Sequence, residues 1–161
     1  MLTAVSRGAG PLHQGWAAAI LGKIMTLSAP ATLLTAAVTI LAILILLAFA
    51  IRVARTRRKV NIFPPAMMGS PELECALRIH GNTVEQIVIF LPALWLSALY
   101  FQGWAPPIIG LVWCLGRIIY AVGYSKDPKA RFPGFFLTIF PSLILIVLAI
   151  IGIVQAWMVN G

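Results

Sequence analysis

Charged residues are scarce in this sequence, and acidic residues are scarcer still. Only 10% of the 161 residues are charged, and only four are Asp or Glu. Soluble domains carry about 25% charged and about 45–50% apolar residues, whereas this chain is 61% hydrophobic and its apolar residues fall in long runs. The composition therefore excludes a soluble globular domain, and the length predicts one compact unit rather than several domains.

Cysteine and histidine are also rare, at two residues each. No CxxC motif or Cys/His spacing predicts a zinc site. Cys75 and Cys114 both fall within predicted spans and are interpreted as small buried hydrophobic residues. The sequence therefore predicts no metal centre.

Four apolar runs are long enough to cross a bilayer, which takes about 20 residues of helix. They predict an all-α integral membrane protein, a bundle of four helices joined by short connections between antiparallel neighbours. The bundle is expected to occupy residues 27–158, after an N-terminal tail at 1–26 to which no function is assigned. The spans are expected at about 29–52, 72–100, 106–124 and 132–158.

The second span has a clear start signal. Ser70 precedes Pro71, and Glu72 and Glu74 follow. A capping residue, a proline at the first helical position and acids in the first turn are typical of a helix N-terminus.

The basic residues predict how the chain lies in the membrane. Five of the twelve basic residues lie between Arg52 and Lys59, and the connector at 125–131 is also basic, whereas the turn at 102–107 carries no charge. The positive-inside rule then places loops one and three in the cytoplasm and both termini on the opposite side. The basic cluster could also bind anionic lipid head groups. Nucleic-acid binding is a poor fit, because no soluble domain carries the cluster. The short loops favour a bacterial inner membrane, with the endoplasmic reticulum as the alternative.

Ionisable residues inside a span are costly, so they suggest function. In the second span Arg78, Asn82 and Glu85 are spaced i, i+4, i+7, which places them on one stripe about 60° wide. His80 points away from this stripe.

The third span carries a similar stripe, formed by Arg117, Tyr120 and Tyr124, with Arg131 just beyond it. Both stripes lie toward the predicted cytoplasmic end, so we expect them to converge on one pocket.

Two interpretations of these residues compete with ligand binding. Arg78 and Glu85 could pair internally and only lock the bundle, or Glu85 could be the carboxylate of a small proton-coupled transporter. The surplus of cations, Arg78, Arg117 and Arg131 against Glu85, favours an anionic ligand instead.

These residues carry a resemblance to a known family. The string Glu74-x-x-x-Arg78-x-His80-x-Asn82-x-x-Glu85 resembles the signature of the MAPEG superfamily, as does Arg117-x-x-Tyr120-x-x-x-Tyr124 followed by Arg131. The pair Pro64-Pro65 precedes Arg78 at a similar distance. The superfamily includes microsomal glutathione transferases, leukotriene C synthase and the five-lipoxygenase-activating protein, and the likeness covers about 27–158.

The resemblance implies a homotrimer with glutathione, as co-substrate, bound between neighbouring protomers. It implies that Arg78, Arg117 and Arg57 take the carboxylates and Glu85 the amine. Further hydrogen bonds would come from Asn82, Tyr120 and Tyr124, and His80 would reach the neighbouring protomer's ligand.

The resemblance further implies the chemistry. Arg131 would hold the thiolate, and Arg58 would act on a lipophilic acceptor that enters from the membrane lipid. The expected function is a glutathione transferase, with peroxidase as an additional activity, and the alternative is a non-catalytic lipid-binding or scaffold protein of the same fold. Gln86 departs from the leukotriene-synthesising branch, which has tyrosine after the glutamate.

Overall fold

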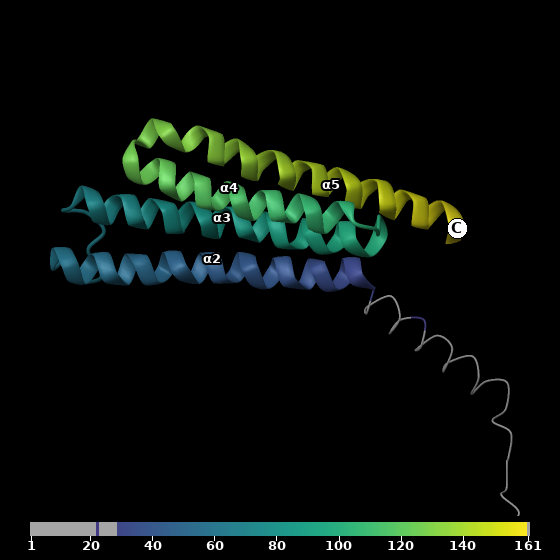
Figure 1. The fold of residues 1–161 in the computed structure, drawn as a ribbon, viewed down its shortest axis with the longest axis horizontal. Helices are drawn as coiled ribbons and strands as arrows, with labels where there is room; N and C mark the ends of the chain where they lie inside the picture. The colour runs from purple at the N-terminus through teal and green to yellow at the C-terminus, as the bar shows by residue number, and fades with distance from the viewer. Residues whose placement is uncertain (1–21, 23–28, 161) are drawn as a thin grey trace, which may run out of the picture.

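The computed structural model describes Gly22 and residues 29–160, so most of the predicted tail at 1–26 lies outside the described residues. The described part is all-helical and forms a bundle of long, antiparallel helices (Figure 1). The elements in chain order are α2 (Pro30–Val60), α3 (Pro71–Tyr100), α4 (Ala105–Lys126), the short 3-10 helix η1 (Pro128–Arg131) and α5 (Phe132–Asn160).

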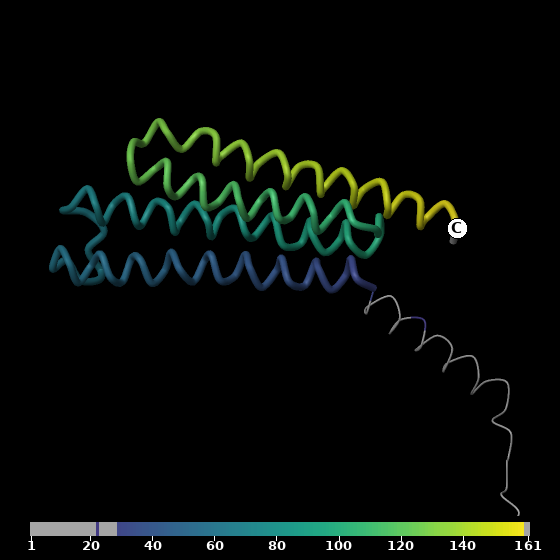
Figure 2. The backbone as a smooth tube through the Cα atoms, viewed as in Figure 1, coloured from purple at the N-terminus to yellow at the C-terminus, as the bar shows by residue number. Residues whose placement is uncertain are grey.

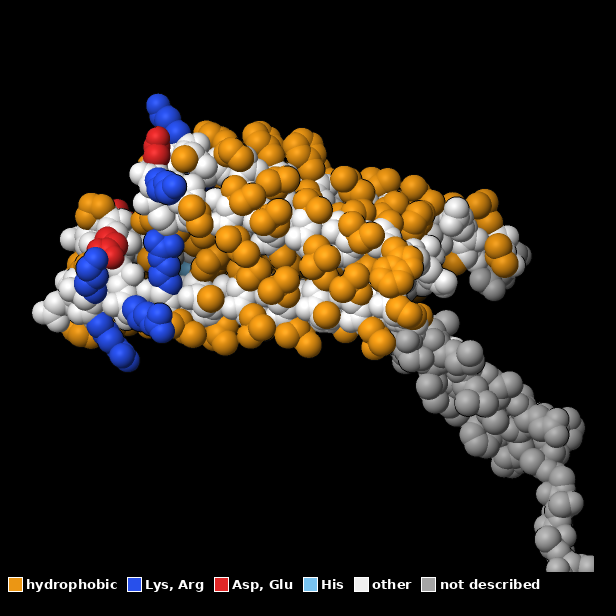
Figure 3. Space-filling view, in the orientation of Figure 1, with side chains coloured by type: hydrophobic (Ala, Val, Ile, Leu, Met, Phe, Trp, Pro, Cys, Tyr) orange, Lys and Arg blue, Asp and Glu red, His pale blue; other side chains and the backbone are white. Residues whose placement is uncertain are grey.

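The four long helices are each long and apolar enough to cross a membrane. In Figure 3 apolar side chains cover most of the visible flank, and charged side chains gather at one end of the bundle. We call this end the basic end. It comprises the C-terminal end of α2, the N-terminal end of α3 and the η1 connection. Such a distribution is that of a multi-pass membrane protein, with its charges held at one interface.

The first helix is longer than the predicted span. It continues through the basic run to Val60, and at the basic end α2 and α3 project beyond α4 and α5 (Figure 2). The start of α3 agrees with the start signal, because Ser70 is the N-cap and Pro71 the first helical residue. The Ser70 side chain makes no capping hydrogen bond, so proline and the first-turn acids carry the signal.

Helices α3 and α4 form the centre of the bundle. Each of them packs against both α2 and α5, whereas α2 and α5 do not contact each other in the described part of the chain. The core between them contains Phe90 of α3 stacked on Trp113 of α4, with ring centroids 4.0 Å apart and planes 3° apart. Close packing of this kind holds helices together in lipid, where burial from water contributes little.

Glycines bring α4 and α5 close together. A Cβ atom on Gly116 would lie 2.6 Å from the carbonyl oxygen of Leu137, and one on Gly134 would overlap the backbone of Tyr120. Small residues let neighbouring backbones approach in this way. The close approach fixes the α4–η1–α5 turn and thereby sets the position of Arg131 beside α4.

Candidate functional site

The two polar stripes predicted from the sequence converge at the basic end. Residues from α3, α4, η1 and α5 surround a hollow of about 430 Å³. We call it the arginine–tyrosine hollow, and its lining consists of Arg78, Asn82, Tyr120, Tyr124, Arg131, Phe132 and Phe135. Five of these residues are predicted site residues, and the two phenylalanines give the hollow an apolar wall.

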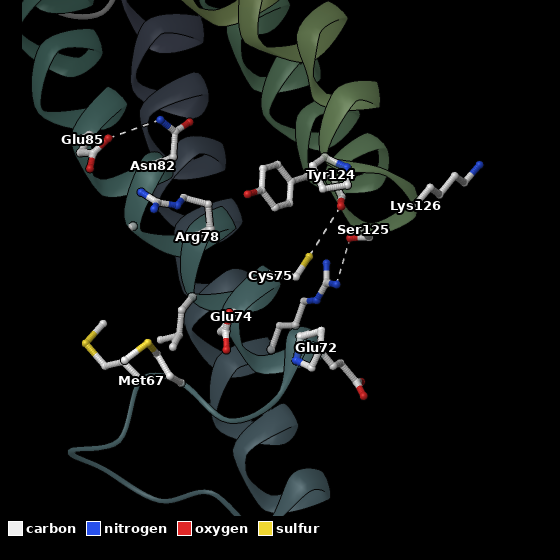
Figure 4. Close-up of a pocket in the computed structure, with 16 residues that line it drawn as sticks. Met67, Glu72, Glu74, Cys75, Arg78, Asn82, Glu85, Tyr124, Ser125 and Lys126 are labelled. Atoms are coloured by element: carbon white, nitrogen blue, oxygen red, sulfur yellow. Dashed lines mark hydrogen bonds between the residues drawn. The ribbon is translucent and has the colours of Figure 1, made fainter.

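A larger hollow of about 890 Å³ adjoins the first and shares Arg78, Asn82 and Tyr124 with it. Figure 4 shows Arg78 on α3 between Glu85 and Asn82 on one side and the Tyr124 ring of α4 on the other. Loop one and the end of α4 complete this larger hollow. Its other lining residues are Arg52, Met67, Met68, Pro71, Glu72, Glu74, Cys75, Leu77, Gly81, Glu85, Ser125, Lys126 and Pro128.

Arg117 behaves differently from the other predicted site residues. Its side chain is fully buried and lines neither hollow. Nη1 donates to Oδ1 of Asn82 at 3.0 Å, and Nη2 donates to Oγ1 of Thr83 at 2.6 Å. The guanidinium also lies 4.4 Å from the centroid of the Tyr120 ring. Arg117 therefore contacts the lining of the hollow from behind.

A chain of hydrogen bonds leads from Arg117 into the larger hollow. Asn82 accepts from Arg117 and, through Nδ2, donates to Oε2 of Glu85 at 3.3 Å. Glu85 is exposed, so its carboxylate stays available to a ligand. Because Arg117 fixes the amide oxygen, the amide nitrogen must face Glu85, and both side chains are held in one orientation.

Arg131 lies at the end of η1, where α4 turns into α5. Its guanidinium is 5.3 Å from the Tyr124 ring centroid and 5.7 Å from that of Phe132. The rings of Tyr120 and Tyr124 are themselves 5.7 Å apart. A half-buried cation thus stands next to the phenol ring of Tyr124 and the phenyl ring of Phe132, in a hollow that Tyr120 also lines.

The cations of the two hollows have no acidic partner in the described chain. Among the described residues the one salt bridge joins Lys59 to Glu72, at 2.9 Å. The alternative in which Arg78 and Glu85 form an ion pair is therefore not seen. The arginine–tyrosine hollow is lined by Arg78 and Arg131 and by no acidic side chain, whereas the three cations of the larger hollow are matched by three glutamates.

Besides Arg117, three more predicted site residues lie outside both hollows. Arg57 donates from Nη1 to the carbonyl oxygens of Ile62 and Ala66, at 3.3 and 2.6 Å, and so holds loop one in place. Arg58 is exposed and His80 is half-buried, and neither lines either of the two hollows.

Sequence reasoning missed several lining residues. Cys75, whose Sγ lies 3.7 Å from the carbonyl oxygen of Tyr124, sits one turn before Arg78, so its helical spacing was a usable signal. Met67 and Met68 in loop one, and Thr83 behind the site, gave no such signal. Among the described residues no group of three or more His, Cys, Asp and Glu side chains is placed to hold a metal ion.

Comparison with known proteins identifies relatives of this chain. The model of the MAPEG family matches residues 33–151. An uncharacterized protein of Synechocystis is 43% identical over 118 residues, which cover 73% of this chain and 86% of the relative. Human microsomal glutathione S-transferase 2 is 37% identical over 79% of this chain and 86% of the relative. Guinea pig leukotriene C4 synthase is 32% identical over 74% of this chain and 80% of the relative.

Proposed function

The chain belongs to the MAPEG family, and on this premise we propose that it is a membrane-embedded glutathione transferase acting on lipophilic electrophiles. The observation that carries the proposal is the pair Arg78 and Arg131, which line one hollow and form no salt bridge with any described residue. Uncompensated arginines near a membrane interface favour a bound anion. Relatives whose names specify glutathione transfer support the identity of that anion.

The polar groups of the site match the groups of glutathione. Glutathione carries two carboxylates, one ammonium group and a thiol. Arg78 would bind a carboxylate in the bidentate manner of arginine, and Glu85, held by Asn82 at 3.3 Å, would bind the ammonium group. Tyr120 and Tyr124 would donate their hydroxyls, and Arg117 would act through Asn82 rather than by direct contact.

Arg131 would activate the thiol. A nearby cation stabilises a thiolate, which is the reactive nucleophile. The thiolate would attack an electrophilic carbon of the acceptor, form a carbon–sulfur bond and expel the leaving group with its electron pair. The apolar acceptor would lie against Phe132 and Phe135, which line the same hollow as Arg131. Peroxidase activity is the additional reaction expected of the same thiolate.

We further propose that glutathione is enclosed by a second protomer within a homotrimer. Arg78 and Glu85 are exposed on the isolated protomer, so a neighbour would be needed to shield the ligand from water. That neighbour would contribute Arg57, Arg58 and His80, which line neither hollow of their own protomer. In this proposal Arg58 acts on the acceptor.

The test replaces Arg131 with alanine in the purified, detergent-solubilised protein. We expect conjugation of glutathione to chlorodinitrobenzene to fall by about 100-fold or more, the effect of removing one anion-stabilising donor from an active site. Glutathione affinity measured by calorimetry should fall by at most about tenfold. The matched control is Lys129→Ala, because Lys129 is exposed, belongs to the same 3-10 helix and lines neither hollow.

Two results would overturn the proposal. The first is no measurable glutathione binding by the unaltered protein. The second is full turnover by the Arg131→Ala variant. A lipid co-purified in the hollows together with inactivity toward a panel of electrophiles would instead support the non-catalytic lipid-binding alternative.

A further inference from the structure

A second feature of the basic end lies on the opposite side of α4 from α5, between α2 and α4. A groove of about 380 Å³ runs between these two helices. Its lining is Phe49, Arg52, Ile118, Ala121, Val122, Ser125 and Lys126. The groove shares Arg52, Ser125 and Lys126 with the larger hollow, whereas the proposed transferase reaction uses none of its apolar residues.

The groove is apolar along its length and cationic at its end. Ile118 and Val122 are spaced i, i+4 on α4 and are 47% and 52% exposed, on a helix apolar enough to span a membrane. Arg52 and Lys126 stand at the basic end of the same groove. This arrangement matches the shape of a phospholipid. The apolar part of the groove could hold an acyl chain, and the cationic end could hold a charged head group.

A hydrogen bond across the groove fixes its cationic end. Nη2 of Arg52 on α2 donates to Oγ of Ser125 on α4 at 2.9 Å. Arginine has five N–H donors in a planar fork, so this bond leaves others available to a phosphate. The Arg52 guanidinium is therefore held at the mouth of the groove rather than ranging over the surface.

No acidic side chain lines the groove itself. The salt bridge in the described residues uses Lys59 and Glu72, and it leaves Arg52 and Lys126 without a carboxylate partner. Arg55 adds a further cation in an adjoining hollow that Arg52 also lines, and the glutamate of that hollow, Glu72, is paired with Lys59. The basic side chains border the apolar flank in the way Figure 3 shows for this end of the bundle.

We propose that the α2–α4 groove binds an anionic glycerophospholipid from the leaflet at the basic end. The phosphate lies between Arg52 and Lys126, and one acyl chain runs along Ile118 and Val122 against Phe49. The proposal commits to a lipid rather than a soluble anion because the cationic end is continuous with an apolar, membrane-facing wall. Juxtamembrane Lys and Arg residues attract anionic lipid in this way.

The test compares lipid retention by native mass spectrometry of the full chain without glutathione. Protein in detergent is given phosphatidylglycerol and phosphatidylcholine with identical acyl chains. We expect phosphatidylglycerol to be retained preferentially, and Lys126→Gln to reduce that retention about fivefold, as expected for the loss of one juxtamembrane charge. Lys129→Gln, at an exposed site of the same end outside the groove, should leave retention unchanged.

A second pair of variants tests the apolar wall. Val122→Trp fills the groove without altering its charge. The control, Val147→Trp, makes the same substitution on α5, where Val147 is 53% exposed and Val122 is 52% exposed. Val122→Trp should reduce phosphatidylglycerol retention severalfold, and Val147→Trp should not. If Val122→Trp does not fold, Lys126→Gln still decides the proposal.

Three outcomes would overturn the proposal. Equal retention of the two lipids would remove the charge argument. Equal effects of Lys126→Gln and Lys129→Gln would indicate diffuse attraction to the basic end. Displacement of the lipid by millimolar inorganic phosphate alone would indicate a simple anion site without a role for the groove.

Discussion

Arg117 and Arg131 place the same functional group in two different surroundings. Arg117 is fully buried and gives its hydrogen bonds to Asn82 and Thr83, whereas Arg131 is half-buried and stands beside aromatic rings at the hollow. Nε of Arg117 has no partner among the described residues. A buried cation without a carboxylate is costly, so its presence favours a role in holding the site rather than in stabilising the bundle.

This interpretation predicts the behaviour of Arg117→Met. Methionine is of similar length and removes the buried charge, so we expect little loss of thermal stability in detergent. Glutathione affinity should fall about tenfold, because Asn82 loses the donor that fixes its amide. Calorimetry on Arg117→Met, Asn82→Ala and the double variant should give a coupling free energy of about 1 kcal/mol or more. Additive effects would instead indicate that Arg117 binds the ligand directly.

The sequence was informative about which residues share a helix face and less informative about which residues of other segments they contact. Helical spacing placed Arg78, Asn82 and Tyr124 on stripes, and all three line both hollows. The same spacing placed Arg117 on a stripe but did not reveal its hydrogen bond to Thr83. Periodicity gives the direction in which a side chain leaves its own helix, but it does not identify the residue on the neighbouring helix that the side chain contacts. The attachment of Arg57 to carbonyls of loop one also depends on loop geometry that no sequence pattern encodes.

Among the helices, the α4–α5 pair does most to position the site. Its close approach at Gly116 and Gly134 brings η1, and with it Arg131, next to Tyr124. The charge pattern predicted that a basic connector joins these two helices, but the tightness of their contact becomes visible only when both backbones are in place. The site geometry thus depends on two residues without side chains.

Gly134→Ala tests this dependence. Its new Cβ would overlap the Tyr120 backbone, so the helices must separate. We expect a loss of about 1–3 kcal/mol in stability, the usual effect of overpacking, together with weaker glutathione binding. Gly81→Ala is the control for stability, because nothing lies within 4 Å of its added Cβ. Thermal unfolding in detergent measures both variants, and an unchanged midpoint for Gly134→Ala would contradict the packing argument.

At the scale of the whole molecule, charge is distributed along one axis. Among the residues that the structure describes, the charged side chains lie toward the basic end, while the turn between α3 and α4 at the other end is uncharged. The positive-inside rule predicts that the basic end faces the cytoplasm. The two hollows open at that end, which would give them access to the cytosolic pool of glutathione.

Cysteine labelling measures this orientation. In a background with Cys75→Ser and Cys114→Ala, Lys129→Cys reports on the basic end and Trp104→Cys on the opposite end, and both positions are exposed. We expect a membrane-impermeant maleimide to label Trp104→Cys in intact cells and Lys129→Cys only after permeabilisation. The reverse pattern would place the hollows on the other side of the membrane.

The burial of Arg117 has a consequence for how the chain is made. A guanidinium near the middle of a span adds about 2.5–3.5 kcal/mol to the free energy of inserting that span alone. The acceptors that relieve this penalty, Asn82 and Thr83, reside on α3, which leaves the ribosome first. Helix α4 is therefore expected to enter the bilayer as a hairpin with α3, so that the polar centre assembles during biosynthesis rather than after it.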